Sequence, residues 1–380
     1  MGKLKLILKP LICCLISALS GYHASSQVFD QNVANYILKI ENPVSFLQRI
    51  EAIGVKEPGQ KGLDSAYLWL KKISLQAGYT PITQKFLFGT DTLRNIEFIK
   101  KGSNDSCIIV GAHYDSKNGP GVNDNGTGNF ALHQVAKLLK NIETKYTIRF
   151  IYFSGEEIDY LGSKYYVRTL NKDKVKIKFM LNLDQLGGTI DGDNSGVKCE
   201  RDEVSFKKTE SNLIALSMAK IYSLYTNLSP IISPAYLSDY LSFRDSGYII
   251  SGVYQSANFP FAHSESDLLK YVEFNSLNST VKGVLAFVIY HSQAKIPAGI
   301  DTELDMSQNI NVYYSDKRLK VVTNKDYSLK VYDGFGKLVF NKLGRSLDTD
   351  VSINYFKNGI YFVLLKTENG EVYKKFLVEP

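Results

Sequence analysis

Three short hydrophobic runs in this chain each end at side chains that bind metal ions. The runs CIIVGA, TIRFIYF and KIKFMLNL are followed, directly or within a few residues, by His113, by Glu156 and Glu157, and by Asp184. Short apolar runs of this kind are typical of buried, mostly parallel strands. Because the carboxyl ends of parallel strands meet at one edge of a sheet, we expect these side chains to lie close together. The sequence therefore predicts an α/β domain with a functional site at that edge.

Helical and strand-like patterns alternate through most of the chain. Apolar residues at helical spacing predict helices over about 27–54, 63–76, 125–139, 157–170, 211–225 and 272–291. The runs ITQKFLF, LRNIEFI and YIISGVY predict further strands. This alternation is typical of an α/β fold with a mostly parallel sheet. We assign it to residues 27–292.

The pattern changes after Ser292. Residues 293–308 have no clear period and contain Pro297 and Gly299, so we interpret them as a linker. From residue 309 to 380, short β-like runs alternate with turns such as Asp-Gly and Asn-Gly, which predicts a small all-β sandwich. That region contains no His or Cys, so we do not expect it to carry the chemistry.

The first 26 residues have the build of a secretory signal peptide. A basic start precedes an apolar stretch that ends in small residues. A membrane anchor, or a lipid anchor through Cys13 or Cys14, remains an alternative. Nothing later in the chain is long and apolar enough for a stable membrane span. Cleavage after Ser26 would leave Cys107 and Cys199, which either pair or serve as small apolar residues.

The charge of the chain argues against nucleic acid as a partner. The formal net charge is +7, and removal of the three lysines of residues 1–26 leaves 7 − 3 = +4. No stripe of basic residues stands out, and such a mild charge does not favour a polyanionic partner.

The candidate ligands suit two zinc ions. Zinc binds His nitrogen and carboxylate oxygen, and two ions about 3.5–4 Å apart need a bridging ligand. Asp124 lies in the glycine-rich segment GPGVNDNGTG and fits that role, because its carboxylate has two oxygens. We expect one ion to be bound by His113, Asp124 and Asp184. The second ion would be bound by Asp124, Glu157 and His263.

Two adjacent glutamates are candidates for the remaining metal ligand and for the general base. Glu156 and Glu157 follow a strand directly one after the other, so their side chains are expected to point apart. We assign Glu157 as a metal ligand and Glu156 as the general base that takes a proton from the attacking water. Asp115, two residues after His113, is expected to orient that histidine, and Asp267 to orient His263.

Each short motif also has an ordinary explanation when taken alone. An HxD sequence is common in loops, SGEE is typical of a helix N-terminus, and NLD can be a simple turn. Their occurrence in order at successive strand ends favours the metal site. His133 and His291 lie on helical stretches and are interpreted as packed or surface residues, and His23 would leave with the signal peptide.

These residues resemble the co-catalytic di-zinc aminopeptidase family, whose relatives include glutamate carboxypeptidases. GAHYDS, GVNDNGTG, SGEEIDYLGS, MLNLDQLGG and HSESD are similar to its five metal-site motifs, in order, over about residues 30–292. The resemblance implies a mixed, mostly parallel sheet flanked by helices, two zinc ions per chain, and peptide substrates cleaved at their N-termini. SDYLSFRDSGY is also similar to the stretch that precedes the last histidine in that family.

The resemblance has departures and leaves alternatives. Ala262 precedes the last histidine where relatives often carry Tyr, and LDQLG replaces the commoner LDMIG. Tyr236 is a candidate oxyanion donor. HYDSK also resembles the secreted glutaminyl cyclases, which bind one zinc ion and cyclise N-terminal Gln. A non-catalytic binding protein is the third hypothesis, although the ligands and the base are all present.

The C-terminal region resembles the sorting domain of the type IX secretion system. The likeness is carried by VYDGFGKLVFN and by KNGIYFVLLKTENGEVYKKFLVEP, whereas the usual early Pro-Asn-Pro is replaced by NVYYSD. The resemblance implies a Gram-negative bacterium, export to the cell surface or the medium, and the type IX secretion machinery as a partner. A plain accessory β-sandwich is the alternative.

Overall fold

The computed structural model describes most of the chain. The described residues are 29–173, 175–191, 194–297, 311–315, 318–323, 325–334, 336–345, 350–368 and 370–378. The expected signal peptide, residues 1–26, lies outside them, as does most of the expected linker, 293–308. The domain boundaries given above therefore stay predictions.

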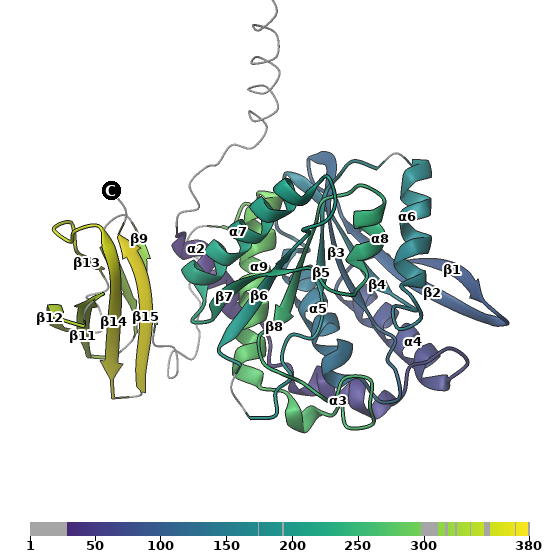
Figure 1. Ribbon diagram of the computed structural model, residues 1–380, viewed down its shortest axis with the longest axis horizontal. Coiled ribbons are helices and arrows are strands. Elements are labelled where there is room, and N and C mark those ends of the chain that lie inside the picture. Colours follow the sequence, from purple (N-terminus) through teal and green to yellow (C-terminus); the bar gives the residue numbers. More distant parts are fainter. Residues whose placement is uncertain are drawn as a thin grey trace, which may run out of the picture.

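An eight-stranded sheet forms the centre of the larger part of the molecule (Figure 1). Its strands in chain order are β1 Ile82–Phe88, β2 Asp91–Lys100, β3 Asn104–His113, β4 Tyr146–Phe153, β5 Ile177–Leu183, β6 Gly196–Arg201, β7 Ser229–Pro234 and β8 Ile250–Gln255. Their order across the sheet is β1-β2-β4-β3-β5-β8-β6-β7. The pairs β3–β4, β3–β5, β5–β8 and β6–β7 are parallel, and the other three are antiparallel. The predicted mixed, mostly parallel sheet is confirmed.

Helices cover both faces of this sheet (Figure 1). The helical elements are α2 Gln31–Tyr36, η1 Ile37–Lys39, α3 Val44–Ile53, α4 Lys61–Gln76, η2 Val122–Thr127, α5 Gly128–Leu139, α6 Leu161–Asp173, α7 Lys208–Tyr225, α8 Tyr240–Asp245, η3 Leu269–Tyr271 and α9 Phe274–Ser292. One apolar cluster joins the sheet to α2, α3, α4, α5, α7 and α9, and a second joins it to α6 and α8. The domain is thus a three-layer sandwich.

The central strand β3 shows why the sheet is buried on both faces. Ile108 and Val110 belong to the larger apolar cluster, whereas Cys107 and Ile109 belong to the smaller one, and all four are fully buried. Side chains alternate between the faces of a strand, so a continuous apolar run serves both layers. Burying each valine or isoleucine side chain contributes about 1.5–3 kcal/mol to the free energy of unfolding.

Three expected helices begin or break elsewhere than the apolar pattern indicated. The stretch 27–54 is divided into α2 and α3, with Pro43 before the second helix. Helix α5 begins at Gly128 instead of Asn125, because residues 122–127 form an irregular turn. Helix α6 begins only at Leu161, since Asp159 and Tyr160 have positive φ angles of 64° and 58°.

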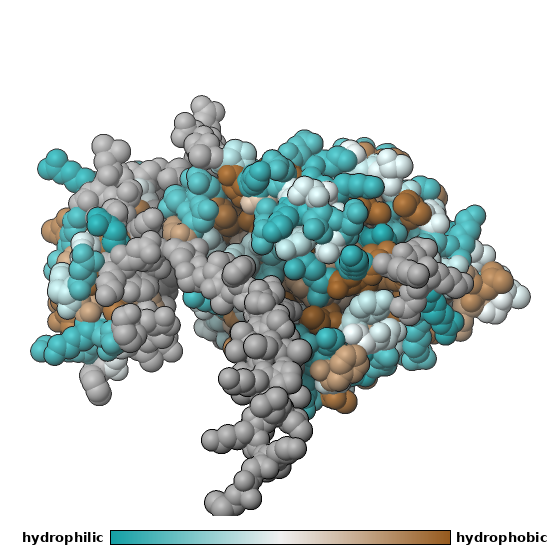
Figure 2. Space-filling model, turned by 90° about the horizontal axis from the view of Figure 1, so that it is seen from above, coloured by the Kyte–Doolittle hydropathy of each residue, from teal (hydrophilic) through white to brown (hydrophobic). Residues whose placement is uncertain are grey.

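The β1–β2 hairpin extends from one side of the sheet (Figure 1). Near its turn, Leu87 is 74% exposed and Phe88 41% exposed. Figure 2 shows hydrophobic residues among hydrophilic ones on the surface of the molecule. Strand β1 is an edge strand, and its Ile82 is also exposed.

The C-terminal region consists of two small antiparallel sheets. The strands are β9 Asn311–Ser315, β10 Arg318–Val322, β11 Tyr327–Asp333, β12 Leu338–Gly344, β13 Asp350–Ser352, β14 Gly359–Thr367 and β15 Gly370–Val378. The orders are β13-β10-β9 and β12-β11-β14-β15. Residues from both sheets, such as Leu319 and Leu329, share one apolar core, so the region is the predicted sandwich.

Two further expectations concern cysteines and membranes. Cys107 and Cys199 are both buried and both free, so they serve as small apolar residues in β3 and β6. Among the described residues, none of the helices combines the length and the apolar character that crossing a membrane requires.

Candidate metal centre

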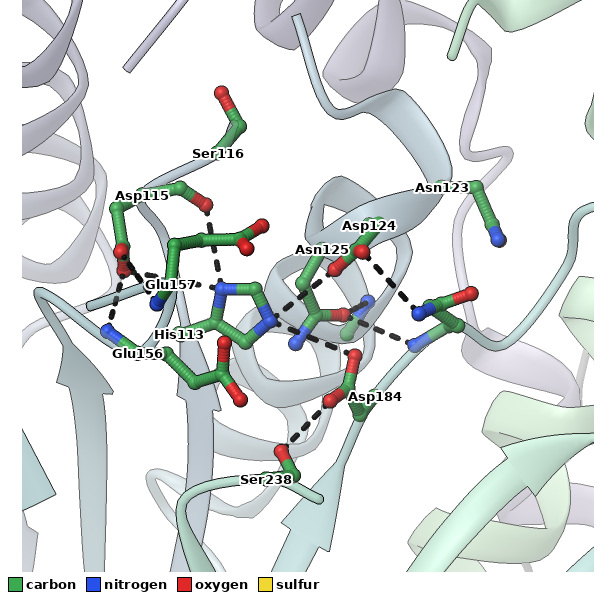
Figure 3. Close-up of polar contacts among 12 residues, drawn as sticks. His113, Asp115, Ser116, Asn123, Asp124, Asn125, Glu156, Glu157, Asp184 and Ser238 are labelled. Atoms are coloured by element: carbon green, nitrogen blue, oxygen red, sulfur yellow. Dashed lines mark hydrogen bonds and ion pairs between the residues drawn. The ribbon is translucent and has the colours of Figure 1, made fainter. Parts of the chain in front are cut away.

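The carboxyl ends of three neighbouring strands form the site. His113 is the last residue of β3, Asp184 follows β5 directly, and Glu156 and Glu157 lie in the turn after β4. These strands are adjacent in the order β4-β3-β5. Figure 3 shows the four side chains converging on a single cluster at this edge of the sheet.

The loop that carries Asp124 is fixed by glycine and by side-chain amides. Gly121 has a φ of +59°, and a Cβ atom there would lie 2.2 Å from the carbonyl oxygen of Asp124, so only glycine allows this turn. Asn125 Nδ2 donates to the carbonyl oxygen of Leu183 (2.8 Å), and Asn129 Nδ2 donates to that of His113 (2.9 Å). The amides therefore connect the loop to the ends of β5 and β3.

Asp124 stands between the two histidines of the site. His113 Nε2 lies 3.2 Å from Asp124 Oδ1, and His263 Nε2 lies 3.2 Å from Asp124 Oδ2. His113 Nε2 is also 3.5 Å from Asp184 Oδ1, while His263 Nε2 is 3.0 Å from Glu157 Oε2. The five residues therefore form two groups that share one carboxylate, with one oxygen of that carboxylate facing each group (Figure 3 shows the His113 side).

The two groups differ in their exposure to solvent. The side chain of His113 is 2% exposed, whereas that of His263 is 50% exposed. His263 comes from the loop between β8 and α9 and has a positive φ of 60°. The group that contains His263 is therefore open on one side.

Electrostatics at the site favour cations. Burial alone would lower the pKa of His113, but the carboxylates of Glu156 and Asp184 raise it well above its ordinary value. Hydrogen bonds to Asp124 and Glu157 raise the pKa of His263 to about 10. Burial opposes ionisation of Asp124, but the two histidines hold its pKa below the usual range. Positive charge is thus strongly stabilised between these residues.

Two buried oxygens of the cluster have no hydrogen-bond partner, and the only ion-pair contact of either is that of Asp184 Oδ1 with His113 Nε2 at 3.5 Å, among the described residues. Asp184 Oδ1 and Glu157 Oε1 accept no hydrogen bond from any described residue, although both are buried. An unsatisfied buried carboxylate oxygen is costly, and a bound metal ion would satisfy it. One of these oxygens belongs to each group, so the donor set fits an ion in both.

Glu156 and Glu157 point to different parts of the cluster, as Figure 3 shows. Glu156 lies with His113 and Asp184, and Glu157 lies with His113 and Asp124, each set within the spacing of a metal site. Glu156 is 9% exposed, and burial raises its pKa well above the ordinary value. A carboxylate with a raised pKa beside the ligands suits an acid–base role.

Asp115 connects the ends of β3 and β4. Its Oδ1 accepts from the backbone N–H of Glu156 (3.3 Å) and its Oδ2 from that of Glu157 (3.1 Å). His113 Nδ1 lies 3.2 Å from the carbonyl oxygen of Asp115 and 3.8 Å from its carboxylate. The residue thus faces His113 as expected, but its carboxylate mainly positions the two glutamates.

Replacing Asp115 with asparagine is expected to destabilise the protein by about 1–3 kcal/mol. An amide offers one acceptor where two N–H groups need one each, so one donor would be left buried and unpaired. Chemical denaturation of the metal-free protein measures the change. Asp91→Asn, on the exposed hairpin, controls for the loss of a carboxylate. A loss no larger than that of the control would contradict this role for Asp115.

The expectation for Asp267 is wrong. Its carboxylate does not orient His263 but accepts from the backbone N–H groups of Asn123 (2.7 Å) and Asp124 (2.9 Å). Spacing of four residues brings side chains together only in a helix, and residues 261–267 form turns. Asp267 therefore holds the loop that carries Asp124.

Sequence reasoning gave no role to Ser238 and Asp239. Ser238 Oγ donates to Asp184 Oδ2 (2.7 Å) and accepts from Asn182 Nδ2 (2.8 Å), so it orients Asp184. Asp239 is fully buried, and burial raises its pKa to about 7. Only the resemblance of the stretch SDYLSFRDSGY pointed to this segment.

A buried glutamate supports the segment that contains Tyr236. The hydroxyl of Tyr240 donates to Glu200 Oε2 (3.1 Å) and accepts from the backbone N–H of Tyr236 (2.6 Å). Tyr236 itself is 75% exposed and lies two residues before Ser238 in the chain. Glu200 is buried, and burial raises its pKa to about 8.

The pKa of Glu200 predicts a pH-dependent loss of stability. Between pH 4.5, its ordinary pKa, and about pH 8, the folded state holds a proton that the unfolded state has released. The stabilisation from this proton is therefore complete below pH 4.5 and is lost as the pH rises to 8. Denaturant titrations give the free energy of unfolding of Glu200→Gln and of the wild type. Between pH 5 and pH 8 the value for the variant should rise by roughly 2–4 kcal/mol relative to that of the wild type. An offset that stays constant with pH would contradict this pKa.

Several curated proteins are similar to part of this chain. Probable leucine aminopeptidase 2 of Trichophyton verrucosum is 32% identical over 182 residues, which cover 45% of this chain and 37% of the relative. The aminopeptidase of Pseudomonas aeruginosa is 30% identical over 180 residues, covering 44% and 32%. The chain thus spans about a third of the length of these relatives.

Solved structures share the fold at low sequence identity. The LapA aminopeptidase of Legionella pneumophila has a TM-score of 0.62 at 20% identity and covers 71% of this chain and 77% of its own. The glutaminyl cyclase of Porphyromonas gingivalis has a TM-score of 0.56 at 18% identity and covers 70% and 100%. Such likenesses establish the fold of the larger region.

Two family models match the chain. Residues 306–379 match the secretion system C-terminal sorting domain, as the resemblance of the C-terminal region predicted. Residues 95–288, which contain every strand end and loop of the site, match the model named peptidase family M28. With half of its length matched and the residues of the site in place, the chain belongs to peptidase family M28.

Proposed function

We propose that this chain is an exported zinc aminopeptidase that hydrolyses the N-terminal peptide bond of peptides. The observation that carries the proposal is the shared carboxylate of Asp124, which has one oxygen facing each histidine. Membership in a peptidase family gives the reaction class. The relatives named leucine aminopeptidase support cleavage at the N-terminus.

The residues of the site would hold two zinc ions. His113, Asp124 and Asp184 would bind one, and Asp124, Glu157 and His263 the other. When bound, zinc polarises the substrate carbonyl and lowers the pKa of a water molecule, which makes the water a nucleophile near neutral pH. Three protein ligands for each ion leave a position for that water and for the substrate.

Glu156 would move the proton. Its carboxylate lies beside His113 and Asp184, and burial raises its pKa well above the ordinary value, which suits a group that accepts and returns a proton. Glu156 takes the proton from the attacking water and returns it to the nitrogen of the departing amine. Asp115 and Ser238 support this step only indirectly, by holding the backbone of Glu156 and the carboxylate of Asp184.

A glutaminyl cyclase is the second candidate. The fold of the Porphyromonas gingivalis enzyme permits it, and a single zinc ion would then be bound by Asp124, Glu157 and His263. In that arrangement the buried Asp184 Oδ1 would bind no ion and would accept no hydrogen bond from a described residue, with His113 Nε2 3.5 Å away. The unsatisfied oxygen therefore favours the two-zinc peptidase.

The test uses the purified full chain. It is assayed on aminoacyl-anilides and on a peptide with N-terminal Gln, with and without a chelator, and its metal content is measured. Release of anilide that the chelator abolishes, with near two zinc ions per chain, is expected. Pyroglutamate formation without anilide release, at near one zinc ion, would replace the proposal with the cyclase. Absence of both activities in zinc-loaded protein would favour a binding protein.

Export is the other half of the proposal. The match of residues 306–379 to a secretion sorting domain supports passage through the type IX machinery, after a signal peptide at residues 1–26 has directed the chain out of the cytoplasm. In a host with that machinery, deletion of residues 309–380 should leave the enzyme inside the cell envelope. Full export of the truncated chain would contradict this route.

A further inference from the structure

Lys56 is fully buried, which is rare for a lysine. It lies between α3 and α4 and forms two backbone bonds with Ser116. Its N–H donates to Ser116 Oγ (3.1 Å), and its carbonyl oxygen accepts from the N–H of Ser116 (3.2 Å). Its ammonium group donates to the carbonyl oxygen of Pro120. Lys56 therefore holds the loop that leads to Asp124 at two points.

The ammonium group of Lys56 interacts electrostatically with the carboxylates of the metal centre, although it forms no ion pair with any described residue. Burial lowers the pKa of Lys56 to about 8, and the carboxylates of Asp267, Asp115, Asp124 and Glu157 oppose that change. Asp267 is the strongest of these, and it is the residue that holds the backbone of Asn123 and Asp124. A buried cation of this kind is tolerated only where carboxylates surround it.

Carboxyl groups outnumber basic groups at the centre, and burial raises the pKa of some of them, to about 7 for Asp239 and Asp267. The buried carboxylates there are Asp115, Asp124, Glu156, Glu157, Asp184, Asp239 and Asp267. The basic groups among them are His113, His263 and Lys56. Lys56 lies outside residues 95–288, so the match to the peptidase family does not account for it.

We infer that Lys56 is a built-in counter-ion of the metal centre, which neutralises part of the carboxylate cluster and holds the Asp124 loop in place before metal binds. The inference rests on the proposed function in one respect, namely that the cluster binds zinc. Lys56 would act as a positioning residue through Pro120 and Asp267, and it would not contact the substrate.

This role differs measurably from that of a lysine that merely fills space. When divalent cations occupy the cluster, the negative field at Lys56 falls, so the ammonium group contributes less to stability. Removing it should therefore cost more stability in the metal-free protein than in the zinc-loaded protein. By linkage, zinc should then bind the variant more tightly than the wild type.

The experiment compares Lys56→Met with the wild type by thermal denaturation of the full chain, stripped of metal and loaded with zinc. The metal-free variant is expected to melt roughly 5–10 °C below the metal-free wild type, and the zinc-loaded variant to lose less than about half of that. Zinc affinity, from competition with a chromophoric chelator, should rise about tenfold.

Two further variants separate charge from packing. Lys282 on α9 is a partly buried lysine whose pKa is lowered by burial alone, so Lys282→Met should lower both melting temperatures equally. Lys56→Arg keeps the charge. The difference in melting temperature between its metal-free and zinc-loaded forms should therefore equal that of the wild type, even if both melting temperatures fall. It also supplies the comparison if Lys56→Met does not fold.

The outcomes distinguish this inference from the proposed function. Two results would overturn the counter-ion role alone. One is that Lys56→Met lowers the melting temperature equally in the metal-free and the zinc-loaded protein. The other is that zinc raises the melting temperature of Lys56→Arg by a different amount from that of the wild type. A wild type that zinc does not stabilise would overturn the metal centre, and the inference with it.

Discussion

Glu156→Gln is expected to lower kcat by about 10²–10⁴-fold while the zinc content and the KM stay near those of the wild type. Glutamine has the size of glutamate but cannot take a proton from water. The ligand groups that include Asp124 and His263 do not depend on Glu156. The loss should therefore fall on the proton transfer and not on metal binding.

The adjacent residue provides a matched control. Glu157→Gln changes the same group one position later in the same turn, yet it removes a carboxylate that lies 3.0 Å from His263 Nε2. It should lose zinc and activity together. Steady-state kinetics and metal analysis of both variants decide the assignment, and turnover of Glu156→Gln within about tenfold of the wild type would remove Glu156 from the base role.

Asp124→Ala is expected to lose both zinc ions and all detectable activity. Its two oxygens each face one histidine, so a single substitution removes a ligand from both groups. It also removes the negative charge that would offset the repulsion between two neighbouring cations. Mass spectrometry of the metal content, with activity measured on the same sample, tests this prediction.

Asp184→Ala is the comparison for that experiment. Of the two histidines, Asp184 lies near His113 and not near His263, and its other oxygen accepts from Ser238. Its variant should therefore keep one ion, bound with Glu157 and His263. If Asp124→Ala also kept one ion, Asp124 would belong to one group only and would not bridge.

The strand ends were predictable because local sequence determines them. CIIVGA, TIRFIYF and KIKFMLNL are too apolar for any position but a doubly covered strand, and the polar residue that follows must lie at its end. The structure confirms the fold that this pattern predicts. It also brings together the seven side chains chosen as site residues, although their roles stay predictions.

Strand β7 shows where the pattern failed. Its sequence SPIISP begins next to one proline and ends at another, which argues against a strand in the middle of a sheet. The structure places β7 at the sheet edge, where one row of N–H groups needs no partner. Strand β6, with Lys198 and Arg201 among its six residues, lacks the apolar run that marked the other strands.

Residues that act through contacts with residues far away in the sequence have no local sequence pattern that reveals them. Lys56 and Pro120 are 64 positions apart, and Ser238 and Asp184 are 54 apart. Nothing near Lys56 in the sequence distinguishes it from a surface lysine. Its burial depends on the tertiary packing of two segments, which periodicity and spacing do not report.

The uneven burial of the two histidines sets an order for metal exchange. His263 is half exposed, whereas His113 is closed off by the protein. An ion bound with His263 would be open to solvent on one side, whereas an ion bound with His113 would be enclosed by the protein. Dilution into a mild chelator should therefore release zinc in two phases. The partly depleted enzyme would retain the inner ion, ready to recover activity when zinc returns.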